Sequence, residues 1–301
     1  MKCVTLGAPS REKALRHKLG LRLPYRGRAD FGWAVNGRHS YDPAKFHIGV
    51  GAMPAKMSTV LKANEPNLAE RRVGEYDWAT VGADLDAFGC AVLKTLLTAS
   101  ECDDIAALYS HEEHFRSHVH MARHGFGKGE YRYFKYPLPA LVGELRTALY
   151  GHVVTFANGW NERMNIATRY PKAHADYLKI CHQAGQTRPT PLLLQYAAGD
   201  FNCLHQDLYG DLAFPLQVTV LLSAPGRDFA GGEFVLTEQR PRMQSRVEVV
   251  PLQQGDAVLF AVHNRPVQGT KGSYRVNLRH GVSRLRSGRR HTLGIIFHDA
   301  R

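Results

Sequence analysis

The spacing of apolar and polar residues divides the chain into a helix-rich part followed by a strand-rich part. Helical spacing of apolar residues runs over three segments, at 139–150, 153–166 and 173–185. After Pro191, short β-rich runs alternate with turn residues, and these runs lie at 192–195, 216–222, 232–236, 247–250, 257–260, 274–279 and 292–297. Helices followed by strands are typical of an α+β fold in which a helical layer supports an antiparallel double sheet.

Two further elements are predicted ahead of the long helical segments. The stretch 84–93 indicates the end of a short helix followed by a strand. Thr98 stands three residues before Glu101 and ahead of further acidic residues, a pattern that marks the start of a helix.

Residues 1–70 differ from the rest of the chain. They mix basic residues with glycine, show little sustained periodicity, and contain a linker-like stretch at 49–54. We therefore expect a basic, flexible N-terminal extension before a domain at 71–301. The extension is interpreted as an unstructured leader, or as sequence upstream of a start at Met53 or Met57. An arm that binds nucleic acid is the alternative.

Composition adds bounds on partners and location. The 301 residues, 44% of them hydrophobic, are enough for the core of one large domain. No apolar run approaches the roughly 18 to 20 residues that span a bilayer, so we expect no membrane partner and a cytoplasmic protein. The net charge of +12 favours an anionic partner, most commonly nucleic acid. The cysteines show no paired spacing and are expected to be reduced: Cys3, Cys90, Cys102, Cys181 and Cys203.

A metal-binding pattern stands in the strand-rich part. His205 and Asp207 flank Gln206, and on a strand this spacing directs the two outer side chains to one side while Gln206 faces away. Two imidazoles and one carboxylate on one face of an octahedral iron leave three positions for a bidentate co-substrate and O2. The pattern therefore needs a second histidine from another strand.

Four downstream histidines compete for that third position: His263, His280, His291 and His298. His280 ends a β-rich run and is followed ten residues later by Arg290, whose guanidinium can form two hydrogen bonds with one carboxylate. His263 is the second choice because Arg275 follows it, whereas His298 lies too near the end of the chain to be followed by such an arginine. The sequence favours His280.

Together these residues resemble a known enzyme core. The motifs that carry the resemblance are His205-Gln-Asp207, Gly231-Gly-Glu-Phe234, Gly255-Asp-Ala-Val-Leu-Phe260 and His280-Gly-Val-Ser283 with Arg290. They are similar to the core of the Fe(II)/2-oxoglutarate dioxygenases, which is a double-stranded β-helix, or jelly roll.

The resemblance implies cofactors and roles. His205, Asp207 and His280 would be the catalytic ligands of Fe(II), with 2-oxoglutarate and O2 as co-substrates and ascorbate as a candidate reductant. Arg290 would bind the distal carboxylate of 2-oxoglutarate. Arg289 is the alternative, because a shift of one residue reverses the face of a strand.

The resemblance also suggests a substrate. The Tyr196-Ala-Ala-Gly199 stretch before His205 is similar to the AlkB nucleic-acid demethylases, in which the equivalent tyrosine touches 2-oxoglutarate. The spacing after His280 is closer to the prolyl-hydroxylase branch. Over most of residues 75–301 the chain resembles an uncharacterised bacterial oxygenase family proposed to act on nucleic acids.

Basic residues favour a phosphate backbone as partner. The last third of the chain is rich in them, at Arg240, Arg242, Arg246, Arg265, Lys271, Arg275, Arg279, Arg284, Arg286 and Arg289. The segment 126–136 alternates aromatic and basic residues, which suits a stacked base, although an ordinary hairpin with aromatics facing the core explains it as well. We expect oxidation or demethylation of a nucleobase in alkylated DNA or RNA. A protein side-chain hydroxylase and an inactive binding module are the alternatives.

Overall fold

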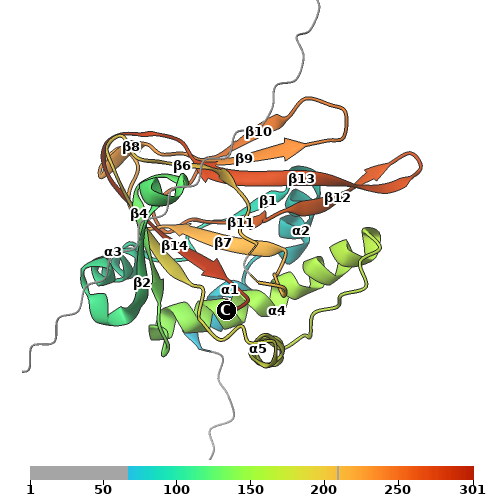
Figure 1. The fold of residues 1–301 in the computed structure, drawn as a ribbon, viewed down its shortest axis with the longest axis horizontal. Helices are drawn as coiled ribbons and strands as arrows, with labels where there is room; N and C mark the ends of the chain where they lie inside the picture. The colour runs from blue at the N-terminus through green and yellow to red at the C-terminus, as the bar shows by residue number, and fades with distance from the viewer. Residues whose placement is uncertain (1–66, 209) are drawn as a thin grey trace, which may run out of the picture. The chain divides into compact units, whose positions relative to one another are not determined.

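The computed structural model describes residues 67–208 and 210–301, drawn in colour in Figure 1. Of the predicted extension, residues 1–70, all but the last four lie outside the described residues. Helix α1 begins within those four, at Leu68. The helices are α1 (Leu68–Gly74), α2 (Trp78–Phe88), α3 (Ala99–Ala107), α4 (Ala140–Arg163) and α5 (His174–Gln183). None of the helices within these residues is long and apolar enough to cross a membrane.

Side chains at the helix ends explain where two of the helices begin and end. The Thr98 hydroxyl accepts a hydrogen bond from the Glu101 amide, and the Glu101 carboxylate accepts one from the Thr98 amide, as the capping pattern predicted. Asp77 caps α2, and Gly89 ends it at a φ of +80°, which favours glycine. The short helix and strand expected at 84–93 are confirmed as α2 and β1 (Cys90–Leu93).

The strands form two antiparallel sheets. The larger sheet contains β1, β11 (Ala257–Ala261), β7 (Leu216–Leu221), β14 (Leu285–Ile296), β5 (Leu192–Ala197), β4 (Glu130–Phe134) and β2 (Phe115–His120) in that order, with β8 (Phe229–Gly231) paired to β14. The smaller sheet contains β10 (Arg246–Val250), β9 (Phe234–Gln239), β13 (Gly272–Val282), β6 (Phe201–His205) and β3 (Gly127–Lys128), with β12 (Asn264–Gly269) paired to β13.

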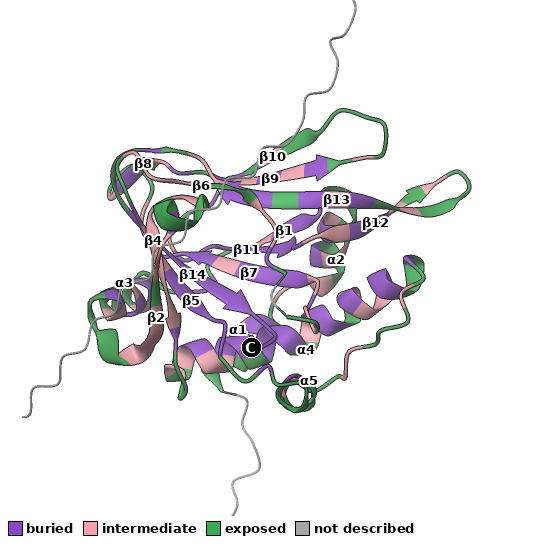
Figure 2. Ribbon diagram, viewed as in Figure 1, coloured by how far each residue is buried: buried purple, intermediate pink, exposed green. Residues whose placement is uncertain are grey.

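The two sheets face each other across an apolar interior, which gives the jelly-roll, double-stranded β-helix core of an α+β fold. Figure 1 shows α1, α4 and α5 on one side of the larger sheet and the smaller sheet on its other side. Figure 2 shows the buried residues concentrated in β7 and β14. The fold class predicted from the sequence is confirmed.

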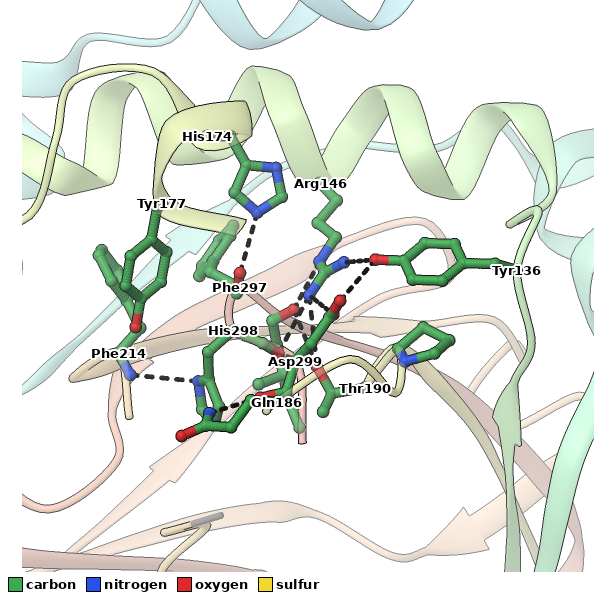
Figure 3. A network of polar contacts seen from close by, with 12 residues as sticks. Tyr136, Arg146, His174, Tyr177, Gln186, Thr190, Phe214, Phe297, His298 and Asp299 are labelled. Atoms are coloured by element: carbon green, nitrogen blue, oxygen red, sulfur yellow. Dashed lines mark hydrogen bonds and ion pairs between the residues drawn. The ribbon is translucent and has the colours of Figure 1, made fainter. Parts of the chain in front are cut away.

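Helix α4 is held to the end of the larger sheet by a buried arginine. Arg146 donates hydrogen bonds to the carbonyl of Ile296 at 2.8 Å and to that of His298 at 3.0 Å, and it pairs with Asp299 at 2.8 Å (Figure 3). The Tyr136 hydroxyl bridges the same two charges. Arg146 and Asp299 have almost no exposed surface, so this network is a structural clamp between helix and sheet.

Candidate metal and co-substrate site

Strand pairing brings the three predicted metal ligands together. His205 is the last residue of β6 and lies directly opposite His280 on β13 in the strand register. Asp207 follows two residues later, with its carboxylate 3.3 Å from Nε2 of His205 and 3.3 Å from Nε2 of His280. The two imidazole centroids are 4.2 Å apart. The three donor groups therefore converge on one point.

The electrostatics of this cluster suit a cation. Burial acts to raise the pKa of Asp207, but the hydrogen bonds and charges of His205 and His280 outweigh it and hold that pKa well below its usual value. Burial also acts to lower the pKa of His205, and Asp207 raises it above its usual value. Burial lowers the pKa of His280. A carboxylate kept ionised beside two imidazoles is a ligand set for a divalent metal.

Surrounding groups fix the orientation of the ligands. Nδ1 of His205 donates to the carbonyl of Cys203 at 2.8 Å, which leaves Nε2 directed at the cluster. The Gln206 amide donates to the carbonyl of Leu278 at 2.7 Å and so ties the segment between the two ligands to β13. The ring of Phe260 packs against His280 with centroids 4.6 Å apart.

The competing histidines lie elsewhere. His263 stands between β11 and β12 and contacts Asn264. His291 bonds to Gln195 through Nε2 at 3.1 Å. His298 accepts a hydrogen bond from the Phe214 amide at 3.1 Å, within the network of Figure 3. Of the four candidates, His280 alone joins His205 and Asp207 among the described residues.

Arg290 is a buried cation in the same pocket. It is 1% exposed, and its Nε and Nη1 atoms have no hydrogen-bond partner among the residues that the structure describes. Burial lowers its pKa to about 10, so the guanidinium stays charged at neutral pH. Burying a charge whose hydrogen-bond donors are unsatisfied costs several kcal/mol, so the site fits an anionic ligand, although Glu233 already attracts this guanidinium.

Arg289 faces the opposite way. It is exposed, and its backbone amide bonds to the carbonyl of Asp228 at 3.0 Å. The alternation of side chains along β14 therefore separates the two arginines, with Arg290 inside and Arg289 outside. The register that the sequence left open places Arg290 in the pocket.

Tyr196 and two glycines, Gly232 and Gly129, define the space around the Arg290 side chain. Tyr196 is its register partner on β5, fully buried, with the guanidinium carbon 5.6 Å from the ring centroid. A Cβ on Gly232 would lie 3.1 Å from Cδ of Arg290, and a Cβ on Gly129 would lie 2.8 Å from the Tyr196 ring. Both glycines also have positive φ angles, so neither position suits a larger residue.

The cavity that joins these groups has a volume of about 180 Å³. Its lining includes the three candidate ligands, Arg290 and Tyr196, and also Gln206, which was expected to face away. Further polar residues of the lining were not predicted: Asn202, Gln217, Thr219 and Thr292. Gln217 is buried, and its Oε1 has no hydrogen-bond partner within the described ranges. A polar side chain within a mostly apolar strand is the sequence feature that could have identified such residues.

The aromatic segment 126–136 divides between the core and the pocket. Phe134 is fully buried, and Tyr136 belongs to the Arg146 network. Phe126 and Tyr131 line the cavity, and Phe126 remains 48% exposed. The core explanation therefore accounts for only part of the segment.

The basic residues of the last third fall into two groups. Arg265 is buried and pairs with Glu238, which also pairs with Arg240 and lies 3.6 Å from Arg246. These arginines satisfy a buried carboxylate, so part of the basic charge that the sequence assigned to a phosphate backbone is neutralised within the protein. Other basic residues are exposed and form no ion pair with a described residue: Arg242, Lys271, Arg275, Arg279, Arg284, Arg286 and Arg289.

Comparison with known proteins now identifies the class. The family described as "Oxygenase, catalysing oxidative methylation of damaged DNA" matches residues 129–300, a range that holds all three candidate ligands and Arg290. The chain belongs to this oxygenase family. The oxidoreductase class and the cofactors expected from the sequence, Fe(II), 2-oxoglutarate and O2, agree with this membership and with the donor set of the pocket.

Individual proteins similar to this chain include one curated relative and two solved structures. An uncharacterised protein of Mycobacterium tuberculosis is 46% identical over 167 residues, which are 56% of this chain and 72% of the relative. A 2OG-Fe(II) oxygenase from Burkholderia pseudomallei has a TM-score of 0.46 and 15% identity, covering 75% of this chain and 93% of its own. A prolyl-4-hydroxylase from Pseudomonas putida has a TM-score of 0.42 and 15% identity, covering 74% and 99%.

Proposed function

We propose that this oxygenase uses Fe(II) and 2-oxoglutarate to oxidise a damaged base in DNA. The observation that carries the proposal is the buried guanidinium of Arg290, whose Nε and Nη1 form no hydrogen bond with a described residue, in the cavity that also holds His205, Asp207 and His280. A pocket that combines a possible metal ligand set with a buried cation is suited to a metal-chelating dicarboxylate.

Each group in the pocket has a role in this proposal. His205, Asp207 and His280 would hold Fe(II), and Arg290 with Tyr196 would hold the distal carboxylate of 2-oxoglutarate. When bound, the metal and its co-substrate supply the activation of O2 that oxidises a C–H bond; oxidation of an N-methyl group would release formaldehyde. The protein contributes position and the exclusion of water, since its apolar walls enclose the site.

A nucleobase suits the mouth of the cavity. Phe126 is exposed there, and its ring stacks on His124 with centroids 5.3 Å apart. Lys128 is exposed two residues away. Aromatic rings beside basic residues support binding of extruded bases and their flanking phosphates. The family description, which names damaged DNA, supports the same substrate class.

The direct test is substrate-coupled succinate formation. Purified protein is incubated with Fe(II), 2-oxoglutarate and either N-methylated single-stranded DNA, the same strand without the lesion, the same sequence as RNA, or proline-containing peptides. The methylated DNA strand should stimulate succinate release and yield formaldehyde in proportion. Duplex DNA should be a poorer substrate, because flipping a paired base costs a few kcal/mol.

Salt dependence tests the phosphate contacts. DNA affinity should fall by about 0.7 to 0.9 log units per neutralised phosphate for each log unit of salt. Changing Arg279 and Arg284 to Glu should weaken binding and reduce that slope while leaving uncoupled 2-oxoglutarate turnover intact. Arg242→Glu is the matched control, an exposed arginine on the loop between β9 and β10.

Stimulation by a peptide, with no affinity for DNA, would instead establish a protein hydroxylase, and binding without turnover would establish an inactive module.

A further inference from the structure

A second cluster of metal-ligand side chains lies on the outer face of the larger sheet. His118 and His120 stand two residues apart on β2, and Glu130 on β4 is the register partner of His120. Nε2 of His118 lies 2.6 Å from the Glu130 carboxylate and Nδ1 of His120 lies 3.4 Å from the same oxygen. The donor atoms of all three residues are within 4.8 Å of one another.

This cluster is separate from the catalytic pocket. Tyr131, the next residue on β4, lines the pocket, so the alternation of side chains directs Glu130 to the opposite face. The same alternation applies on β5, where Tyr196 lines the pocket and Gln195 does not. The cluster is partly exposed, which gives an ion access from solvent.

A ladder of side chains orients the carboxylate. Four residues lie directly opposite one another on neighbouring strands: His120 on β2, Glu130 on β4, Gln195 on β5 and His291 on β14. The Gln195 amide donates to one oxygen of Glu130 at 3.0 Å, and Nε2 of His291 contacts the Gln195 carbonyl oxygen at 3.1 Å. The other Glu130 oxygen is the one directed at both histidines. Such second-layer bonds are typical of metal ligands.

The ring of His118 is also fixed from the side. It packs edge-on against Tyr109 with centroids 6.4 Å apart. The His118 and His120 rings lie 4.4 Å apart, close enough for both to reach one ion. Two imidazole nitrogens, one carboxylate oxygen and a water form a tetrahedral set that suits Zn(II).

We propose that His118, His120 and Glu130 form a Zn(II) site that clamps β2 onto β4 on the back of the sheet holding the co-substrate pocket. Binding would replace the contact between His118 and Glu130 with bonds from both residues to the ion. The ladder through Gln195 ends at His291, the neighbour of Arg290, so the ion also stiffens the strands that carry the pocket. The site does not depend on the proposed substrate.

The experiment counts metal ions in metal-free protein titrated with Zn(II), and follows Co(II) as a spectroscopic substitute. Wild-type protein should bind about two equivalents, one in each cluster. The double variant His205→Ala/His280→Ala should keep the outer equivalent, with the intense visible bands of tetrahedral Co(II). Adding His118→Ala or Glu130→Gln to that variant should weaken the remaining site by about 100-fold or more, and Gln195→Leu by roughly tenfold.

Matched controls separate metal loss from misfolding. His111→Ala removes an exposed histidine on the same surface outside the cluster and should leave both equivalents in place. Glu130→Gln keeps the shape of the side chain and its place beside Gln195, and circular dichroism checks that each variant is folded. The proposal is overturned if the double variant binds no metal, or if its Zn(II) affinity is unchanged by both His118→Ala and Glu130→Gln.

Discussion

Replacing Arg290 with Met should separate co-substrate binding from stability. The wild-type guanidinium is buried, and its Nε and Nη1 form no hydrogen bond within residues 67–208 and 210–301. Its carbon lies 5.6 Å from the Tyr196 ring centroid and 5.9 Å from that of Phe229. Without a bound anion this charge destabilises the fold, and methionine fills similar space without it. The variant should therefore bind 2-oxoglutarate poorly and yet be at least as stable as the ligand-free wild type.

The magnitude follows from the burial of the pair. Removing one partner of a buried charge pair costs about 3 to 5 kcal/mol, which corresponds to roughly 10²- to 10⁴-fold in the 2-oxoglutarate requirement. Metal affinity should change little, because Arg290 is not among the groups that converge on the cluster. In the absence of ligand the free energy of unfolding should rise, on the order of 1 kcal/mol.

Thermal unfolding with and without 2-oxoglutarate and Mn(II) measures both effects. Wild-type protein should gain melting temperature as the co-substrate is added, and Arg290→Met should not. Arg289→Met is the matched control, since that side chain is exposed on the opposite face of β14. Should Arg289→Met lose the response and Arg290→Met keep it, the assignment of the anchor is wrong.

Three further changes test the fold around the pocket. Arg146→Met should lower the free energy of unfolding by about 3 to 5 kcal/mol in chemical denaturation, because it leaves Asp299 buried without its main partner; little change would refute the clamp. Burial lowers the pKa of His174 and that of His298 to about 4, so both are neutral in the folded protein near pH 7. The free energy of unfolding should therefore be full above about pH 6.5 and decrease as the pH drops toward 4, by about 1.4 kcal/mol per pH unit per histidine. The His298→Asn variant should show a shallower decrease, and an unchanged slope would count against a neutral, buried His298. Gly232→Ala should lower the free energy of unfolding by about 1 kcal/mol or more, because of the φ of +66° and because the new Cβ would lie 2.2 Å from Cδ1 of Leu285. The same Cβ would lie 3.1 Å from Cδ of Arg290, so 2-oxoglutarate binding should weaken as well; wild-type affinity would show that the Arg290 side chain is not displaced.

The sequence could bring two of the three candidate metal ligands together because the spacing of His205 and Asp207 is local. A two-residue spacing places His205 and Asp207 near one point, and the following arginine marked His280 among four histidines. The choice between Arg289 and Arg290 could not be made from spacing, since it depends on which face of β14 is covered. Tertiary packing makes that choice: Arg290 lies opposite the buried Tyr196.

Other features lay beyond local patterns. From the sequence alone, Gln217 has the pattern of a half-exposed strand residue. It is buried because β7 lies between β11 and β14 in the sheet. The structure has one helix at 140–163 where two were predicted, because buried residues on both sides of Gly151 keep α4 continuous. The strand at 264–269 was not predicted, because Pro266 has no amide proton to donate to a neighbouring strand. Among the described residues β12 pairs with β13 alone, so it is an edge strand, where a proline is tolerated.

The most direct test of the central claim is iron-dependent succinate formation by wild-type protein, His280→Ala and His263→Ala. The site predicts that wild-type protein converts 2-oxoglutarate to succinate only with Fe(II), and that His280→Ala abolishes this turnover. His263→Ala should retain it, since His263 lies apart from the His205 and Asp207 cluster. Full activity of His280→Ala, or loss of activity in His263→Ala instead, would contradict the assignment.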